Sequence, residues 1–431
     1  MSRRARDARR RPVLAAVVAA LLTGAALAPT GAAVAAPQRP GVASSTADIV
    51  RSKEYWLDSY RIRSAWSTTR GAGVTIAIID TGIDGGVAEL RGAVVGGQDF
   101  SGRGRPAGTP EGDGDEHGTM VASLAAGRGT GTDSGVIGVA PAASLLSLSV
   151  GFGENNNGSD QQIADAVRYA VDHGAEVINL SLTRNTLGWP ESWDAAFLYA
   201  EQHDVVVVAA AGNRGGGTSE VGAPATIPGV LAVGGVTQSG ASSQDASAQG
   251  ITLGVAAPSE NLVGVVPGGG YVLWDGTSGA APIVSGVVAL VRAAHPELSA
   301  VNVINRIIAT AHDAGPSGPD DLYGYGLVDA AAAVSANVQS VAANPLGDLQ
   351  EWIRVNRRAT AAPSPPSSGV VTEPEKIAAP PPRNPVGTLL PSPVLLEVVG
   401  LPLLVVLLML YVLGGLIAGA VLHFRSLRRT E

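Results

Sequence analysis

The sequence predicts a three-layer α/β/α domain with a mostly parallel sheet, followed by a C-terminal transmembrane helix. Short runs that are apolar on both faces alternate with helical patterns, which is typical of a parallel sheet covered by helices. Residues 398–422 are a run of 25 residues without a charge, long enough to span a bilayer with some tilt. A proline-rich stretch that cannot bury a core separates the two.

Five apolar runs are the predicted strands of the parallel sheet. They cover residues 74–80, 144–150, 176–182, 204–212 and 230–236. Between two of them, "SDQQIADAVRYAVDHG" places Ile163, Ala166, Val167, Ala170 and Val171 on one helical face, with Gly174 as a stop signal. In such sheets, functional groups gather beyond the carboxyl ends of the strands.

The N-terminal 36 residues are predicted to be a secretion signal. "MSRRARDARRRP" carries six arginines, an uninterrupted apolar run follows it, and "AVAAP" offers cleavage near Ala35 or Ala36. We favour the general export pathway over a twin-arginine route. An uncleaved membrane anchor is the alternative, but the apolar run is short for a span.

The composition excludes several classes of function. The formal net charge is −8, and loss of the six arginines and one aspartate of residues 1–36 makes it −13. Because phosphates require a basic surface, the acidic balance argues against nucleic-acid binding. The chain contains no cysteine, which rules out disulfides and thiolate catalysis.

The remaining segments define the expected domain organisation. After the signal over 1–36 we expect an N-terminal extension (37–70) and a globular domain (71–340). A proline-rich linker (341–393), a transmembrane helix (394–424) and a cytoplasmic tail (425–431) should follow. The arginines that follow the span favour a cytoplasmic tail. A buried helix of a soluble domain is the alternative interpretation of the span. "EYWLDSYRIRSAWSTTRG" (54–71) is expected to pack on the domain through its aromatic residues, the alternative being a disordered leader.

Four polar residues lie beside glycines where strands end or helices begin. Asp80 closes the first strand, in a place suited to orienting another group or to forming a turn. His117 begins an apolar helical pattern. The sequence gives little support for His117 as a metal ligand, because no second histidine lies at a ligand spacing from it. Asn213 follows a buried strand, where its amide can bind an oxyanion or form a turn. Ser278 starts a long apolar helix among small residues, either as a cap or as a nucleophile favoured by the helix dipole.

Asp80, His117 and Ser278 follow one another in the order acid, base, nucleophile, which is the order of the catalytic residues in subtilisin-type proteases. "AIIDTGID", "HGTMVASLAAG", "VINLSL", "AAAGN" and "GTSGAAPIVSGVVAL" resemble segments of subtilisin-type serine proteases (subtilases), over about residues 70–335. The resemblance implies that Ser278 attacks a peptide carbonyl, His117 transfers its proton and Asp80 orients His117. It further implies that Asn213 and the Ser278 N–H bind the oxyanion.

The resemblance also implies a substrate-binding region. Ser181, Leu182 and Thr183 would pair with a protein or peptide substrate as an added strand, and Ala210 and Gly212 would line the first specificity pocket. The chain departs from the family at two places: Gly279 stands where a bulky Met is common, and Thr183 where a Gly is common. A threonine there would narrow the pocket.

The combination of signal, protease domain, proline-rich spacer and single C-terminal span resembles the mycosins, membrane-anchored subtilases that accompany type VII secretion in actinobacteria. The function expected is a membrane-anchored extracytoplasmic serine endopeptidase. The alternative is a structural component of a type VII secretion complex in which proteolysis is secondary. About 40 residues separate the signal from Asp80, so we expect no large folded pro-domain.

We expect no cofactor. Asp84, Glu89 and Asp99 lie in a region where subtilases often bind calcium, and carboxylates with backbone oxygens suit that ion. Solvated loop acids are the commoner outcome for such residues, and the two interpretations stay open.

Overall fold

The computed structural model describes residues 48–357, apart from 104–106, 111–114 and 152–158, together with Met409. The chain divides into two compact units, Met1–Ala361 and Ala362–Glu431. The predicted signal, the proline-rich stretch after residue 357, the transmembrane helix and the tail lie outside the described residues, except for Met409. All other described residues belong to the first unit.

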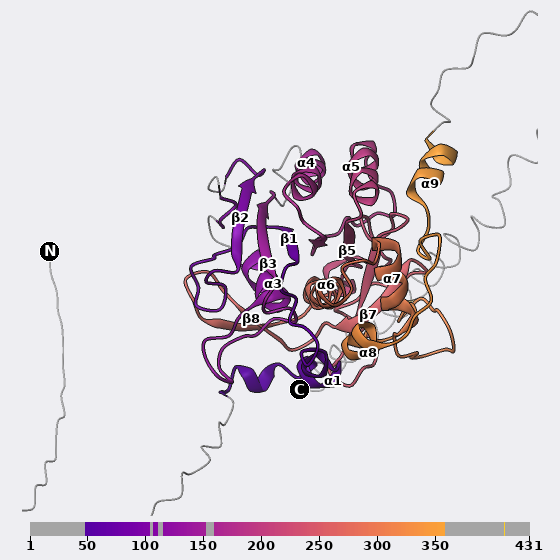
Figure 1. The fold of residues 1–431 in the computed structure, drawn as a ribbon. Helices are drawn as coiled ribbons and strands as arrows, with labels where there is room; N and C mark the ends of the chain where they lie inside the picture. The colour runs from indigo at the N-terminus through magenta and orange to yellow at the C-terminus, as the bar shows by residue number, and fades with distance from the viewer. Residues whose placement is uncertain (1–47, 104–106, 111–114, 152–158, 358–408, 410–431) are drawn as a thin grey trace, which may run out of the picture. The chain divides into compact units, whose positions relative to one another are not determined.

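A seven-stranded sheet is the middle layer of this unit, and each neighbouring pair of its strands is parallel (Figure 1). The strand order is β2-β3-β1-β4-β5-β6-β7. The bounds are β1 Thr75–Asp80, β2 Val94–Asp99, β3 Ser144–Ser149, β4 Val177–Leu180, β5 Val206–Ala210, β6 Leu231–Val236 and β7 Leu253–Pro258. The five predicted strands are β1, β3, β4, β5 and β6. The predicted class of the domain, three layers around a mostly parallel sheet, is confirmed. Strands β2 and β7 were not predicted from the sequence.

Helices cover both faces of the sheet, as expected for strands that are apolar on both sides. On one face lie α3 (His117–Ala126), α6 (Thr277–Ala294) and α7 (Ala300–Ala309), with α8 (Ala330–Ser335) packed on α6. On the other face lie α4 (Ser159–Asp172) and α5 (Glu191–Gln202), which pack against each other. Figure 1 shows α4 and α5 on the opposite side of the sheet from α3 and α6.

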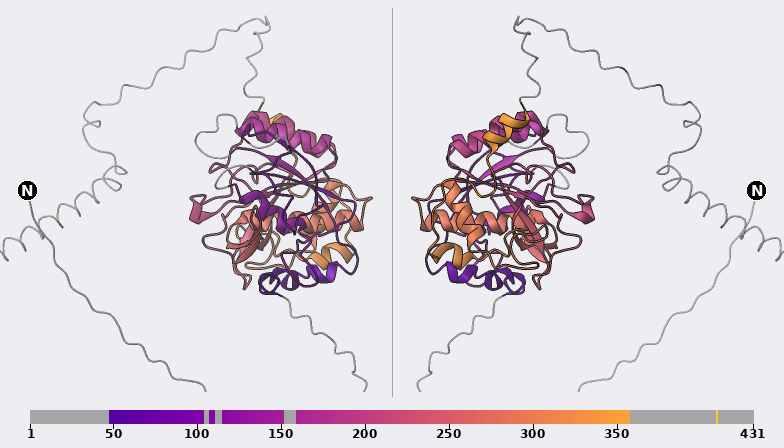
Figure 2. Two further views of the ribbon diagram at one scale, coloured as in Figure 1. Left: turned by 90° about the vertical axis from the view of Figure 1, so that its left-hand side faces the viewer. Right: turned by 90° about the vertical axis from the view of Figure 1, so that its right-hand side faces the viewer.

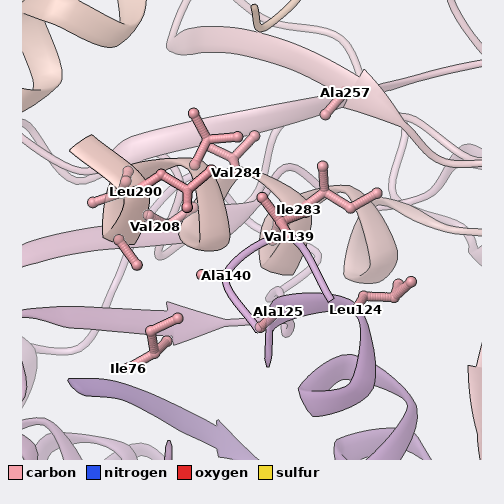
Figure 3. Packing of buried hydrophobic residues seen from close by; sticks show 14 of the residues in the cluster. Ile76, Leu124, Ala125, Val139, Ala140, Val208, Ala257, Ile283, Val284 and Leu290 are labelled. Atoms are coloured by element: carbon pink, nitrogen blue, oxygen red, sulfur yellow. The ribbon is translucent and has the colours of Figure 1, made fainter. Parts of the chain in front are cut away.

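The central helix α6 joins the sheet to α3. Ile283 and Val284 of α6, Leu124 of α3 and Ile76 of β1 are fully buried and belong to one apolar cluster, part of which is drawn in Figure 3. Among the described residues, α6 is the one helix long and apolar enough to cross a membrane, but 83% of it is buried inside the unit. Burial of this helix therefore anchors the residues at its N-terminus.

The N-terminal segment packs on the domain as expected. It forms η1 (Arg51–Lys53), α1 (Trp56–Ser59) and α2 (Ile62–Ala65), the indigo helices that Figure 2 shows at the opposite end of the unit from α4 and α5. Trp56 is fully buried, the Tyr55 hydroxyl donates to the Glu260 carbonyl at 2.8 Å, and the Trp66 indole donates to the Val139 carbonyl at 2.8 Å. Burial of Trp56, together with partial burial of Tyr55 and Trp66, explains why this segment is ordered.

A buried carboxylate fixes the start of this segment. Glu54 is 2% exposed, accepts a hydrogen bond from the Ile137 N–H at 2.8 Å, and lies 2.7 Å from Arg51 Nε. Burial raises the pKa of Glu54 to about 8, although the Ile137 N–H and the Arg51 guanidinium lower it. The folded state therefore holds a proton on Glu54 more tightly than the unfolded chain does.

Residues 341–357, which were assigned to the linker, pack on the domain instead. They include α9 (Leu349–Asn356), which Asp348 caps by accepting from the Glu351 N–H at 2.8 Å. Leu349 is buried, the Trp352 ring lies 4.2 Å from that of Trp189, and Arg357 Nε donates to Asp194 of α5 at 2.7 Å. The apolar spacing within "LGDLQEWIRV" is the signal for this helix that the composition-based assignment missed.

Candidate active site

The structure places the four polar residues of the sequence pattern at element ends. Asp80 is the last residue of β1, and His117 is the first residue of α3. Asn213 follows β5, and Ser278 is the second residue of α6. Since β1 and β5 belong to one parallel sheet, Asp80 and Asn213 lie beyond the same, carboxyl edge of that sheet.

Asp80 and His117 are joined directly. His117 Nδ1 lies 2.8 Å from Oδ1 and 3.0 Å from Oδ2 of Asp80, whose side chain is fully buried. The Thr81 N–H donates to Asp80 Oδ1 at 2.7 Å. A Cβ at Gly118 would lie 2.4 Å from the Gly82 carbonyl oxygen, so α3 packs directly against the loop that follows β1. This close packing holds the imidazole on the carboxylate and leaves Nε2 as its second reactive atom.

The carboxylate also sets the proton affinity of the imidazole. Burial lowers the pKa of His117, but the charge and hydrogen bond of Asp80, together with Glu116, raise it by more, so the net shift is upward. The side chain of His117 remains 31% exposed. It is thus a partly accessible base whose proton affinity is increased by a buried acid.

An aromatic side chain that was not predicted to belong to the site packs on His117. The Trp274 ring contacts the imidazole edge to face, with centroids 5.7 Å apart and an interplanar angle of 74°. Trp274 ends β9 (Tyr271–Trp274), which forms an antiparallel hairpin with β8 (Leu262–Val265) just before α6. A tryptophan four residues before Ser278 is the only sequence signal for this contact.

Ser278 is held by a reciprocal pair of hydrogen bonds to Ser181. Ser278 Oγ donates to the Ser181 carbonyl at 3.1 Å, and Ser181 Oγ donates to the Ser278 carbonyl at 2.8 Å. Behind them, Asn179 Nδ2 donates to Ser181 Oγ at 2.9 Å and Asn179 Oδ1 accepts from Ser285 Oγ at 2.9 Å. Asn179 of β4 and Ser285 of α6 are fully buried, so this network ties α6 to β4 and to the segment that follows it.

In this unliganded arrangement the Ser278 hydroxyl points to a backbone carbonyl, and no hydrogen bond joins it to His117 in the described part of the chain. Hydrogen bonds between nucleophile and base are often long or absent before substrate binds. A rotation about one side-chain bond of Ser278 redirects the hydroxyl.

Asn213 is oriented by the residue that precedes Ser278. Asn213 Oδ1 accepts from the Thr277 N–H at 2.9 Å and from Thr277 Oγ1 at 3.0 Å, and the Gly212 N–H donates to Thr277 Oγ1 at 3.1 Å. Because Oδ1 is engaged, Nδ2 is the atom left to donate, and it lies 3.0 Å from the position of a Cβ on Gly276. Thr277 is fully buried. Its orienting role was not predicted from the sequence.

The five residues predicted to bind substrate lie around this centre. Ser181 and Leu182 are buried after β4, and Thr183 is partly exposed. Ala210 ends β5, and Gly212 follows with φ +108°, a conformation that favours glycine. A methyl group of Thr183 lies 3.3 Å from the position of a Cβ on Gly212, so the two proposed walls of the pocket are close together.

The departure at Gly279 has a steric cause. A Cβ at this position would lie 2.2 Å from Leu262 Cδ1 and 3.3 Å from the Trp274 ring. Leu262, which is fully buried at the start of β8, therefore occupies the volume that a larger side chain would need. The glycine allows the hairpin to pack against the first turn of α6.

The three acids considered for calcium each accept hydrogen bonds from the protein. Asp84 accepts from the Gly86 and Gly268 N–H groups, Glu89 accepts from the Tyr271 hydroxyl at 2.6 Å, and Asp99 accepts from Ser101 and Ser149. Within the described residues, no three or more His, Asp or Glu side chains form a group that would hold a metal ion.

Known proteins share this architecture. The model of the subtilase family (peptidase S8) matches residues 71–326. Mycosin-1 of Mycobacterium tuberculosis is 37% identical over 342 residues, which cover 66% of this chain and 73% of mycosin-1. Subtilisin E of Bacillus subtilis is 37% identical over 269 residues, 61% of this chain and 66% of that protein. The crystal structure of MycP1 from the ESX-1 type VII secretion system has a TM-score of 0.59 and 33% identity, and covers 68% of this chain and 88% of MycP1. The chain therefore belongs to the subtilase family of serine endopeptidases and is similar to the mycosins within it.

Proposed function

We propose that this chain hydrolyses peptide bonds through an acyl-enzyme on Ser278. The observation that carries the proposal is the direct bond between His117 Nδ1 and the buried Asp80 carboxylate at 2.8 Å. Trp274 links this pair to the start of α6, because its ring contacts His117 and lies 3.3 Å from the position of a Cβ on Gly279, the residue after Ser278. Ser278 Oγ attacks the scissile carbonyl carbon while His117 Nε2 takes its proton. Asp80 holds the imidazole and stabilises the imidazolium that forms.

The oxyanion that forms on the carbonyl needs donors already in place. Asn213 Nδ2 is free to donate because Thr277 engages the other end of that amide. The Ser278 N–H, at the positive end of the α6 dipole, is the second donor. His117 then gives its proton to the leaving amine, the C–N bond breaks, and water deacylates the serine by the same steps in reverse order.

The test is covalent labelling of the full chain in detergent with a fluorophosphonate probe. We expect one labelled serine, Ser278, and loss of labelling in Ser278→Ala and His117→Ala. Ser59→Ala, a change at an exposed serine of α1, is the matched control and should label as the wild type does. Folded protein that does not label would contradict the proposal.

We further propose that the chain is a single-pass membrane protein whose protease domain lies outside the cytoplasm. The 25 uncharged residues over 398–422 and the arginines after them support this topology. Membrane fractionation of the full chain and of a chain ending at residue 393 tests it. The full chain should sediment with membranes and the shortened chain should not; equal distribution would contradict the anchor.

A role in a type VII secretion complex is the second candidate. It is supported by the similarity to MycP1, whose structure is described as coming from the ESX-1 type VII secretion system. Secretion from cells that carry Ser278→Ala, compared with cells that lack the gene, separates the two roles. If secretion survives Ser278→Ala but not the deletion, the structural role dominates; if both abolish it, proteolysis is required.

A further inference from the structure

The side chain of the substrate residue that supplies the scissile carbonyl must enter the space between residues 181–183 and Gly212. This placement rests on the proposed function. We propose that Thr183 fills most of that space, so the chain cleaves after glycine, alanine or serine and rejects leucine, phenylalanine and other large residues.

The first wall of the pocket is covered by methyl groups. Thr183 Cγ2 lies 3.3 Å from the position of a Cβ on Gly212, and Thr218 Cγ2 and Cβ lie 2.6 and 3.0 Å from that same position. Since a Cα–Cβ bond adds about 1.5 Å, the Thr183 methyl lies within about 5 Å of Gly212 Cα. An aromatic ring between two walls needs about 7 Å, twice the usual carbon–carbon contact of about 3.5 Å. A ring therefore does not fit between Thr183 and Gly212.

Gly222 forms a second side of this space and contacts the same threonine, Thr183. A Cβ at Gly222 would lie 2.5 Å from Thr183 Oγ1 and 1.8 Å from the Arg184 carbonyl oxygen. Only a glycine at position 222 allows the backbone of residues 183–184 to lie this close. The methyl group of Thr183 thus points toward Gly212 and its hydroxyl toward Gly222. The space left for a substrate side chain next to Ser278 is therefore shallow.

Hydrogen bonds keep this arrangement closed. The Arg184 N–H donates to the Ala223 carbonyl at 2.7 Å, and the Ala223 N–H donates to the Thr186 carbonyl at 3.0 Å. Thr218 Oγ1 is also hydrogen-bonded to Asn185 Oδ1. Thr218 is 5% exposed, so its side chain has little freedom to move aside. Opening the pocket for a large side chain would break these backbone bonds.

The test is the rate at which the full chain in detergent reacts with tripeptide diphenyl phosphonates that differ only in the residue carrying phosphorus. We expect the alanine compound to react at least 100-fold faster than the leucine and phenylalanine compounds, since each excess methylene changes selectivity by about 10- to 200-fold. Thr183→Gly should accelerate the phenylalanine compound at least tenfold. Thr68→Gly, the same change at an exposed threonine of the N-terminal segment, should leave the ratio unchanged.

Thr183→Ser provides a milder variant in case the glycine disturbs the loop. It keeps the hydroxyl against Gly222 and removes only the methyl that faces Gly212, so it should accelerate the leucine compound. Equal reaction, or none, across the series in a protein that a simple fluorophosphonate labels would overturn the inference and leave the proposed function intact. Folded protein that the fluorophosphonate does not label would instead contradict the proposed function itself.

Discussion

The packing of the β8–β9 hairpin against the first turn of α6 gives a quantitative prediction for Gly279→Ala. The added Cβ would lie 2.2 Å from Leu262 Cδ1, whereas carbon atoms in contact are about 3.5–4.0 Å apart. The overlap exceeds about 1 Å, and Leu262 is fully buried, so its side chain has no solvent to turn into. Overpacking of this kind costs about 1–3 kcal/mol.

A change at Leu262 tests whether its contact with the added methyl causes the loss of stability in Gly279→Ala. Leu262→Ala alone should cost about 2–5 kcal/mol because it leaves a cavity. In the double variant the new methyl enters that cavity, so the total loss should be smaller than the sum by about 1–3 kcal/mol.

Thermal unfolding of the full chain, followed by tryptophan fluorescence, measures these losses, with about 2–4 °C of Tm expected per kcal/mol. Gly188→Ala is the matched control, because a Cβ there meets nothing within 4 Å and its φ is not in the left-handed region. Strictly additive losses in the double variant would refute the steric explanation.

Three further results are expected. Asp80→Asn should lower kcat by about 10⁴-fold. It should also move the acid limb of the pH profile of kcat/KM to lower pH, because Asp80 raises the pKa of His117 and only the neutral imidazole acts as a base. An acid limb at the wild-type pH would contradict this. Glu54→Gln should remove part of the fall in Tm between pH 5 and pH 8, because a raised pKa of about 8 means that the folded state loses stability as Glu54 ionises; an identical fall would contradict it. Asn179→Ala should cost about 2–4 kcal/mol by breaking two buried hydrogen bonds, and should slow fluorophosphonate labelling of Ser278; wild-type Tm and labelling would refute the network.

The sequence was sufficient for the central part of the fold. The runs that became β1, β3, β4, β5 and β6 are apolar on both faces, which is the clearest pattern that a covered parallel strand can have. The edge strand β2 reads "VVGGQD", with two glycines and little burial, so it lacks that pattern. Strand β7 reads "LGVAAP" and is fully buried. Its small residues carry little hydrophobic signal although tertiary packing buries all of them.

The sequence predicts those residues of the site that belong to recognisable motifs. It does not predict the residues that reach the site only through tertiary packing. Asp80 and His117 were predicted from glycine-flanked element ends, and the structure joins them directly. The contact of Trp274 on His117 and the bonds of Thr277 to Asn213 link residues more than 60 positions apart. No local periodicity encodes such contacts. The domain also extends to α9, beyond the predicted boundary at residue 340. Residues 341–357 contain one proline and an apolar helical pattern, and therefore differ from the proline-rich stretch that follows them.

The central claim is that Ser278, His117 and Asn213 act on the same carbonyl. A crystal structure of the chain bound to a peptide boronate that ends in the alanine analogue tests this claim most directly. We expect boron bonded to Ser278 Oγ, one boron oxygen about 2.7–3.1 Å from Asn213 Nδ2, and His117 Nε2 within hydrogen-bonding distance of the adduct. An adduct on Ser278 from which both nitrogen atoms stay out of reach would contradict the claim.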